Sequence, residues 1–171
     1  MAQIRPFKGL RYNQKQVGDL GQVITPPYDV ISPAQQDELH RNSPYNIIRL
    51  EYGKEESSDN AKDNRYSRAA RILKDWLLEN AITVDKKASY YLYEQTYPYK
   101  QKSYHRRGLI AALKLEPYSR KAILPHELTM SGPKKDRLAL LSETRTNISP
   151  IFTIFPDPDR QIDLYFSWIN A

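Results

Sequence analysis

Apolar residues recur every three or four positions between residues 59 and 81, which is the pattern of a helix that buries one face. The recurring side chains are Tyr66, Ala69, Ala70, Leu73, Trp76, Leu77 and Ala81. Such spacing places them on one side of a helix, because side chains three and four residues apart are neighbours there. The sequence therefore predicts an amphipathic helix that packs this face against a core.

Two further helices are predicted from capping signals. Ser32 can cap a helix over residues 33–42, where a proline takes the first helical position and Gln35 can complete a capping box. Pro133 is expected to begin another helix, which runs to about residue 144. The 12 prolines of the chain thus mark the boundaries of ordered elements and do not form a proline-rich tract.

Short runs rich in β-branched and aromatic residues predict strands. These runs cover residues 45–51, 89–96, 108–115 and 149–155. A polar turn over residues 97–106 separates the second run from the third, so the two are expected to pair as an antiparallel hairpin. Because strands and helices do not alternate regularly, we expect an α+β fold with a mixed, mainly antiparallel sheet and flanking helices.

Length and composition narrow the class of protein. A chain of 171 residues suits one ordinary domain, so residues 1–171 are expected to form a single domain. No cysteine is present, which excludes disulfides, thiolate metal sites and a cysteine nucleophile. With no signal peptide and no run of about 18 apolar residues, a cytoplasmic protein without a membrane partner is expected.

The charge of the chain favours anionic partners. Its net charge of +6 would attract nucleotides, phosphorylated metabolites, nucleic acid or an acidic protein. The glycine-rich nucleotide loops, the nucleophile elbow and the usual zinc-binding spacings do not occur in the sequence. A binding site for an anion must therefore be sought in less familiar segments.

Residues 124–141 carry the strongest candidate site. The expected start of the helix at Pro133 places three cations in its first turn or just past it. These cations are Lys134, Lys135 and Arg137. Each costs a few tenths of a kcal/mol at the positive end of a helix dipole, and a bound phosphate would offset that cost. Thr129 and Ser131 add hydroxyl donors to this candidate phosphate site. The alternative interpretation is an ordinary helix start whose basic side chains are solvated and bind no ligand.

Carboxylates and a histidine near these segments are candidate catalytic groups. His126 and Glu127 could supply a base or hold a metal ion. In the segment 25–32, two prolines fix the backbone and present Tyr28 and Asp29. Asp29 could act as a general base, a magnesium ligand or a ribose partner. The alternative is a structural turn in which its carboxylate accepts backbone N–H groups.

Aromatic and basic residues interleave over residues 97–107, in the sequence YPYKQKSYHRR. Such interleaving is typical of surfaces on which the bases of nucleic acid stack. The same pattern also describes an exposed hairpin with alternating faces and no ligand. Nucleic-acid binding here is therefore one of two open interpretations.

Four segments of the chain together resemble the bacterial and archaeal "domain of unknown function 1015" family. They are TPPYDVIS, SPYNIIRLE, GLIAALKLE and LPHELTMSGPKKDRLALLSETRTNISPIF. The most specific signatures are PPYD at residues 26–29 and PHE-x-T-x-x-GPK-x-DR at residues 125–137. The resemblance extends over residues 4–155.

This resemblance implies a fold and an activity. Family members look distantly similar to sulfiredoxin, chromosome-partition B proteins and free-serine kinases, which handle nucleotides. They usually continue further and carry a later DGHHR-like motif, which this sequence lacks. Residues 1–171 are accordingly expected to be the N-terminal part of a longer architecture.

Two functions are therefore expected. The first is a nucleotide- or phosphate-binding protein. Its more specific form is a kinase-type phosphotransferase that acts on a small metabolite and uses Mg²⁺ and a nucleotide. The cations of residues 134–137, with Thr129 and Ser131, would bind phosphate, and Glu127, Asp29 or His126 would act in catalysis. The second is a non-catalytic basic module that binds nucleic acid or a protein partner.

Overall fold

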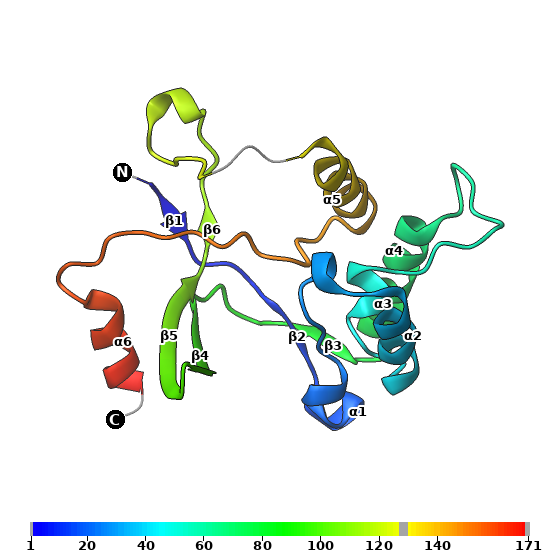
Figure 1. The fold of residues 1–171 in the computed structure, drawn as a ribbon, viewed down its shortest axis with the longest axis horizontal. Coiled ribbons are helices and arrows are strands. Elements are labelled where there is room, and N and C mark those ends of the chain that lie inside the picture. Colours follow the sequence, from blue (N-terminus) through cyan, green and yellow to red (C-terminus); the bar gives the residue numbers. More distant parts are fainter. Residues whose placement is uncertain (1, 127–129, 170–171) are drawn as a thin grey trace. The chain divides into compact units, whose positions relative to one another are not determined.

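The computed structural model describes residues 2–126 and 130–169, and chain contacts divide it into two compact units (Figure 1). The helical unit comprises Leu10–Val84 and Glu127–Ser149. The hairpin unit comprises Met1–Gly9, Asp85–His126 and Pro150–Ala171. Each unit is thus assembled from segments that are distant in the sequence.

The helical unit contains the longest helices. Its α-helices are α1 (Gln14–Val17), α2 (Pro33–Asn42), α3 (Ile48–Glu51), α4 (Arg65–Leu78) and α5 (Ser131–Thr144). Strands β2 (Leu10–Tyr12) and β3 (Ile82–Val84) pair antiparallel, and the 3₁₀ turns are η1 (Leu20–Gln22) and η2 (Tyr28–Val30). The capping box predicted at Ser32 and Gln35 is present at the start of α2. The predicted amphipathic helix is α4, and its buried residues include Leu73 and Trp76.

The core of the helical unit lies largely where α4 meets α5. Its buried members are Leu50, Ala69, Leu73, Trp76, Ala81, Ile82 and Leu140. The rings of Tyr12 and Tyr45 each lie 6.0 Å from the ring of Trp76, so aromatic contacts extend this core. The apolar face predicted for α4 is thus buried at Ala69, Leu73 and Trp76, whereas Leu77 of that face is exposed and Ala81 lies just past the end of the helix.

The strand predicted over residues 45–51 is wrong, because Ile48–Glu51 forms α3 and the residues before it form a turn. Asn46 is fully buried, and its side-chain amide donates to the carbonyl oxygens of Gln22 and Ile24 at 2.8 and 3.0 Å. The same side chain accepts a hydrogen bond from the backbone N–H of Ile48 at 2.9 Å. A buried polar side chain must be satisfied in this way, and here it holds the start of α3 against the preceding loop.

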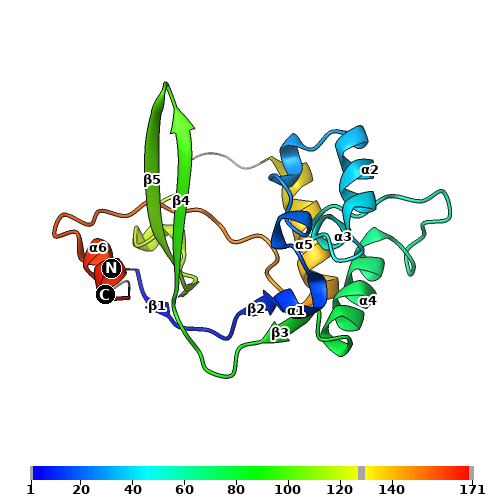
Figure 2. The ribbon, with the colours of Figure 1, turned by 90° about the horizontal axis from the view of Figure 1, so that it is seen from below.

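The hairpin unit is built on β4 (Tyr91–Tyr99) and β5 (Lys102–Ile110), which pair antiparallel along nine residues each (Figure 2). Strands β1 (Ile4–Arg5) and β6 (Ala112–Leu113) form a second pair, followed by η3 (Tyr118–Arg120) and, near the end of the chain, α6 (Gln161–Ile169). The hairpin was predicted, but the turn is only Lys100 and Gln101, with φ of 45° and 62°. Residues 97–106, predicted as a polar turn, mostly continue the two strands.

The described elements confirm an α+β fold with antiparallel strand pairing. The strands form three separate two-stranded sheets, β1–β6, β2–β3 and β4–β5. The strand predicted over residues 149–155 is wrong, since this segment has no regular structure and Ile151 and Ile154 are exposed. In residues 2–126 and 130–169, no helix is long and apolar enough to cross a membrane.

Candidate functional site

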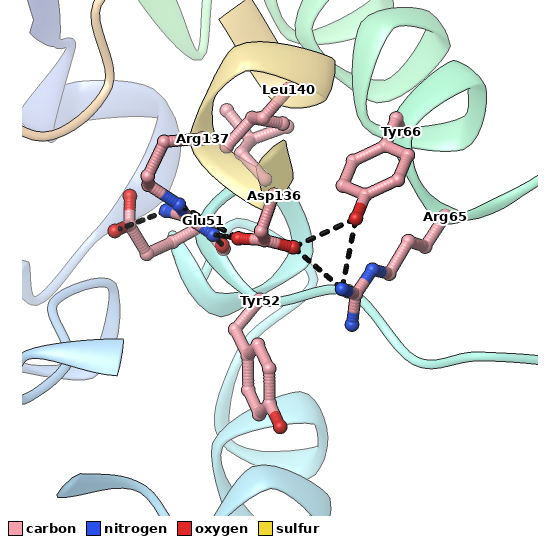
Figure 3. A pocket seen from close by; sticks show the side chains of 9 residues that line it. Glu51, Tyr52, Arg65, Tyr66, Asp136, Arg137 and Leu140 are labelled. Carbon is pink, nitrogen blue, oxygen red and sulfur yellow. Dashed lines mark hydrogen bonds and ion pairs between the residues drawn. The ribbon is translucent and has the colours of Figure 1, made fainter. Parts of the chain in front are cut away.

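The candidate site in the helical unit is a small pocket centred on Asp136, in the second turn of α5 (Figure 3). The Asp136 carboxylate lies between two arginines that come from different helices. Its Oδ1 accepts hydrogen bonds from Arg65 at 2.5 Å and from the Tyr66 hydroxyl at 2.7 Å. Its Oδ2 accepts from Nε of Arg137 at 2.8 Å. One carboxylate thus joins the start of α4 to the start of α5.

Arg137 extends this network to the end of α3. Its Nη1 donates to Oε1 of Glu51 at 2.9 Å, and its Nη2 donates to the backbone carbonyl of the same residue at 2.9 Å. The Ser149 hydroxyl also donates to Oε1 of Glu51. Charge-assisted bonds of this kind are stronger than neutral ones and fix the orientation of the guanidinium. The donors of Arg137 are therefore engaged by two carboxylates and one carbonyl.

The PPYD segment meets the same arginine through its tyrosine. The guanidinium carbon of Arg137 lies 4.1 Å from the centre of the Tyr28 ring, which is a close cation–π contact. The ring of Tyr28 lies 6.5 Å from that of Tyr52, which in turn faces Arg65 at 5.8 Å. Two segments that the resemblance singled out, residues 26–29 and 132–137, therefore lie side by side.

The electrostatics of the pocket keep its carboxylate charged. Burial alone would raise the pKa of Asp136, but hydrogen bonds from Tyr66 and Arg137 and the charges of Arg137 and Arg65 hold it below its ordinary value. Burial raises the pKa of the Tyr66 hydroxyl, and the hydrogen bond to Asp136 acts in the same direction. The ion pairs are partly buried, with 17% of the Asp136 side chain exposed. Two arginines and two carboxylates, Asp136 and Glu51, balance one another in charge.

An open hollow of about 320 Å³ adjoins this pocket and shares Tyr52, Gly53 and Arg65 with it. Its other lining residues are Gln36, Lys54 and Glu55. Glu55 pairs with Arg65 at 3.1 Å, while Lys54 pairs with Asp37 on α2. The hollow is therefore polar, and it can admit a small hydrophilic molecule beside the arginine network.

The predicted phosphate-binding residues divide into two groups in the structure. Lys134 and Lys135 are exposed, and neither forms an ion pair with any residue the structure describes. Arg137 is three-quarters buried in the network, since 26% of its side chain is exposed. Ser131 is exposed and is the first residue of α5, two positions before the predicted start. Thr129 lies outside the described residues.

The predicted catalytic residues are divided between the two units and the residues outside the described parts of the chain. Asp29 lies in η2 beside Tyr28, is exposed, and makes no hydrogen bond with described residues. His126 is exposed and belongs to the hairpin unit. Glu127 lies outside the described residues. Within residues 2–126 and 130–169, no group of three or more His, Cys, Asp or Glu side chains is placed to hold a metal ion.

Sequence reasoning missed four members of the network: Glu51, Arg65, Tyr66 and Asp136. Asp136 and Glu51 are part of the segments GPKKDR and NIIRLE, so the resemblance contained a signal for them. Arg65 and Tyr66 lie in the first turn of α4, where spacing assigned Tyr66 only to the apolar face and gave Arg65 no role. Only the folded chain brings Arg65 and Tyr66 to the Asp136 carboxylate and places Glu51 beside the guanidinium of Arg137.

The fold and the site define an α+β protein with a charge-balanced arginine–carboxylate cluster beside an exposed pair of lysines. The chain belongs to the family described as "Protein of unknown function (DUF1015)", whose model matches residues 4–171. This match confirms the resemblance drawn from the motifs. Neither the curated proteins nor the solved structures give a significant match. The more distant similarity to sulfiredoxin and free-serine kinases, and the expected longer architecture, stay predictions.

Proposed function

We propose that the helical unit binds a small phosphate-bearing molecule, such as a nucleotide, at the start of α5. The observation that carries the proposal is the contrast between the lysines and arginines of this helix. Arg137 donates to the carboxylates of Asp136 and Glu51 and to one backbone carbonyl. Lys134 and Lys135, in contrast, are exposed and form no ion pair among the described residues. Because α5 begins at Ser131, these lysines are its fourth and fifth residues, from which they could contact an anion bound at the positive end of the helix.

The arginine network then serves as a support for this phosphate site. It ties the start of α5 to α3, to the start of α4 and to Tyr28 of the PPYD segment. A binding site is more effective when hydrogen bonds already hold its supporting residues in place, because less conformational freedom is then lost on binding. In this proposal Arg137 is a positioning residue, and Lys134 and Lys135 contact the phosphate.

Asp29 is the best-placed carboxylate for chemistry at such a site. It follows Tyr28, whose ring rests on Arg137, and its own side chain is exposed. Magnesium is commonly held by one or two carboxylates together with phosphate oxygens, and a single free carboxylate suits that role. In a kinase-type transfer, Asp29 would alternatively act as the base. It would accept the proton of the substrate hydroxyl while the hydroxyl oxygen bonds to the γ-phosphorus and the nucleoside diphosphate leaves.

The first experiment measures the Tm of the full chain with ATP, ADP, pyrophosphate and, as the control without phosphate, adenosine, each with and without Mg²⁺. A ligand at 100 times its dissociation constant should stabilise the protein by about 2.7 kcal/mol. We expect a rise in Tm with the phosphate-bearing ligands and none with adenosine. Equal Tm values with every ligand would contradict the proposal.

Variants assign the effect to the helix start. The double variant Lys134→Ala/Lys135→Ala should abolish the rise in Tm without lowering the Tm of the free protein, because both side chains are exposed. The matched control is Lys74→Ala, which removes an exposed lysine about two turns along α4 from Arg65. A rise that survives in the double variant would move the phosphate site elsewhere.

Catalysis is tested separately from binding. Incubation with labelled ATP, Mg²⁺ and a panel of small hydroxylated metabolites should give one phosphorylated product. The variant Asp29→Asn should keep nucleotide binding and lose this product, since it removes the base or metal ligand without changing the shape of the side chain. Product formed equally by Asp29→Asn would exclude the role proposed for this carboxylate.

A further inference from the structure

The two faces of the β4–β5 hairpin differ in composition. Residues directly opposite each other on the two strands share a face, and successive residues of a strand alternate between faces. The pairing of Tyr97 with Tyr104 and of Gln95 with Arg106 defines one face. We call it the tyrosine face. Its members are Tyr91, Tyr93, Gln95, Tyr97, Tyr99, Lys102, Tyr104, Arg106, Gly108 and Ile110.

The opposite face of the hairpin is already engaged by α6. Arg107 on that face pairs with Glu94 at 2.6 Å and with Asp163 of α6 at 3.3 Å. The guanidinium of Arg107 also lies 5.2 Å from the ring of Phe166, which is the buried residue of α6. The two faces therefore have different roles in the fold, and packing against α6 explains only one of them.

Four of the five tyrosines of the tyrosine face are exposed, whereas Tyr91 is half-buried against Phe7. The rings of Tyr97 and Tyr104 are stacked across the two strands, with centroids 5.9 Å apart and an angle of 21° between their planes. Tyr99 meets Tyr104 edge-on at 6.0 Å. The residues Tyr93, Tyr97, Tyr99 and Tyr104 are between 39% and 55% exposed. Opposite Tyr93 is Gly108, and a Cβ atom added there would meet nothing within 4 Å.

The charge of the tyrosine face is positive. Residues 91–110 contain four cations and a single carboxylate, Glu94, which lies on the opposite face and pairs with Arg107. Of the remaining cations, Lys102 and Arg106 belong to the tyrosine face, and Lys100 in the turn lies 5.3 Å from the ring of Tyr99. Arg106 donates to the side chain of Gln95 and lies 5.2 Å from the ring of Phe152, but it pairs with no carboxylate among the described residues. Aromatic rings and unbalanced cations thus share one exposed surface along the hairpin.

We infer that the tyrosine face binds single-stranded nucleic acid. Unpaired bases stack on exposed aromatic rings whatever their sequence, and neighbouring cations contact the phosphates. Aromatic rings on adjacent strands of a sheet are a known arrangement for holding two or three such bases. Here Tyr97 and Tyr104 supply adjacent rings on two strands, while Lys100, Lys102 and Arg106 supply the charge.

Single strands fit this surface better than a duplex or a membrane. Bases inside a duplex are already stacked on each other, so their faces cannot contact tyrosine rings. A membrane surface would require large apolar side chains that enter the acyl region, whereas the exposed rings of this face carry hydroxyl groups. The inference concerns the hairpin unit alone and does not depend on the phosphate site proposed for the helical unit.

The test is fluorescence anisotropy of labelled 15-nucleotide single strands, of DNA and of RNA, with the full chain. We expect the single strands to bind, and a duplex of the same length to bind at least about tenfold more weakly than they do, because only unpaired bases can stack on the tyrosine rings. Three phosphate contacts should give a slope of about −2 when the logarithm of the binding constant is plotted against the logarithm of the salt concentration. Affinity should therefore fall about 20-fold between 50 and 200 mM salt.

Two double variants separate the rings from the charges. Tyr97→Leu/Tyr104→Leu should weaken single-strand binding at least about tenfold, while Tyr97→Phe/Tyr104→Phe retains the stacking rings and should bind about as tightly as the parent. Lys100→Ala/Lys102→Ala should flatten the salt slope by about 1.4. The matched control is Lys87→Ala, an exposed lysine of the same unit outside the hairpin.

Several results would overturn the inference. Absence of single-strand binding by the parent chain would do so, as would equal binding by the leucine and phenylalanine double variants. Equal affinity for the duplex would show a purely ionic surface. Binding to vesicles with anionic lipids, without binding to nucleic acid, would assign the face to membranes. Circular dichroism of each variant checks that the strands remain folded.

Discussion

The helical unit and the hairpin unit obtain their order in different ways. Among the described residues, all buried hydrophobic side chains belong to the helical unit except Phe166 of α6. In the hairpin unit, large apolar side chains such as Ile151, Ile154 and Trp168 are at least 75% exposed. A two-stranded hairpin is only marginally stable by itself in water. The comparison teaches that core packing holds the helical unit, whereas a backbone ladder and a few surface contacts hold the hairpin unit.

The largest expected effect is the loss of a core side chain from the helical unit. Trp76→Ala should lower the free energy of unfolding of this unit by about 3–5 kcal/mol, because it removes buried area and leaves a cavity. Amide hydrogen exchange along α4 measures the effect. Phe166→Ala is the counterpart in the hairpin unit, and it should speed exchange in α6 while leaving α4 protected. Loss of protection in α4 from both variants would break the comparison.

A smaller effect is expected from the arginine–carboxylate network. Asp136→Asn keeps the size of the side chain but weakens its charge-assisted bonds to Arg65 and Arg137, and should cost about 1.5–3 kcal/mol. The measurement is urea unfolding of the helical unit. Asp63→Asn is the control, because Asp63 pairs with Arg71 where both side chains are more than half exposed. Such a pair contributes about 0–1 kcal/mol, so equal losses in both variants would contradict a special role for the network.

The hairpin unit should respond instead to its turn. Gln101 has a φ of 62°, a left-handed conformation that favours glycine. Gln101→Gly should stabilise the β4–β5 ladder by about 1 kcal/mol, because the left-handed region costs other residues about that much. Slower amide exchange in the ladder, with unchanged exchange in α4, would confirm this. Ser103→Gly, at an extended position, should act in the opposite direction.

Local sequence patterns predicted those elements whose order is set locally. The helix α2 follows from the capping box of Ser32 and Gln35, and α4 follows from an apolar period that continues for several turns. The antiparallel hairpin also followed from local composition. Its turn was predicted at the right place but too long. Polar residues and tyrosines alternate over residues 97–106 along two exposed strands, and an exposed strand of this composition has the same polar content as a loop.

Long-range contacts explain what the sequence could not predict. Residues 45–51 have the β-branched content of a strand. Asn46, however, donates hydrogen bonds to two carbonyl oxygens more than 20 positions away and accepts one from the nearby backbone N–H of Ile48, and these bonds fix a helical turn. For the candidate site, the helix cations were predicted, but the carboxylates that engage Arg137 were not. Glu51 is 86 residues away from it in the sequence, and no spacing rule connects such residues.

A further expected effect is a pH dependence that belongs to the helical unit. Burial, followed by the charges of Arg49 and Lys54, lowers the pKa of His40 from its ordinary value of 6.5 to about 4, against a smaller opposite effect of Asp37. The Nε2 atom of His40 is buried and has no hydrogen-bond partner among the described residues. Protonation therefore favours the unfolded chain between pH 6.5 and about 4, and stability should fall as the pH is lowered through that window.

His40→Gln should remove this slope, because glutamine does not titrate. The chain has two tryptophans, and Trp168 is 75% exposed, so Trp168→Phe leaves Trp76 as a fluorescent probe of the helical unit. In that background, urea midpoints between pH 7 and pH 4 should fall for the parent and stay level for His40→Gln. His105→Gln, in the hairpin unit, should keep the slope of the parent. A slope that survives in His40→Gln would assign the acid sensitivity to another group, and a slope removed by His105→Gln would place it in the hairpin unit.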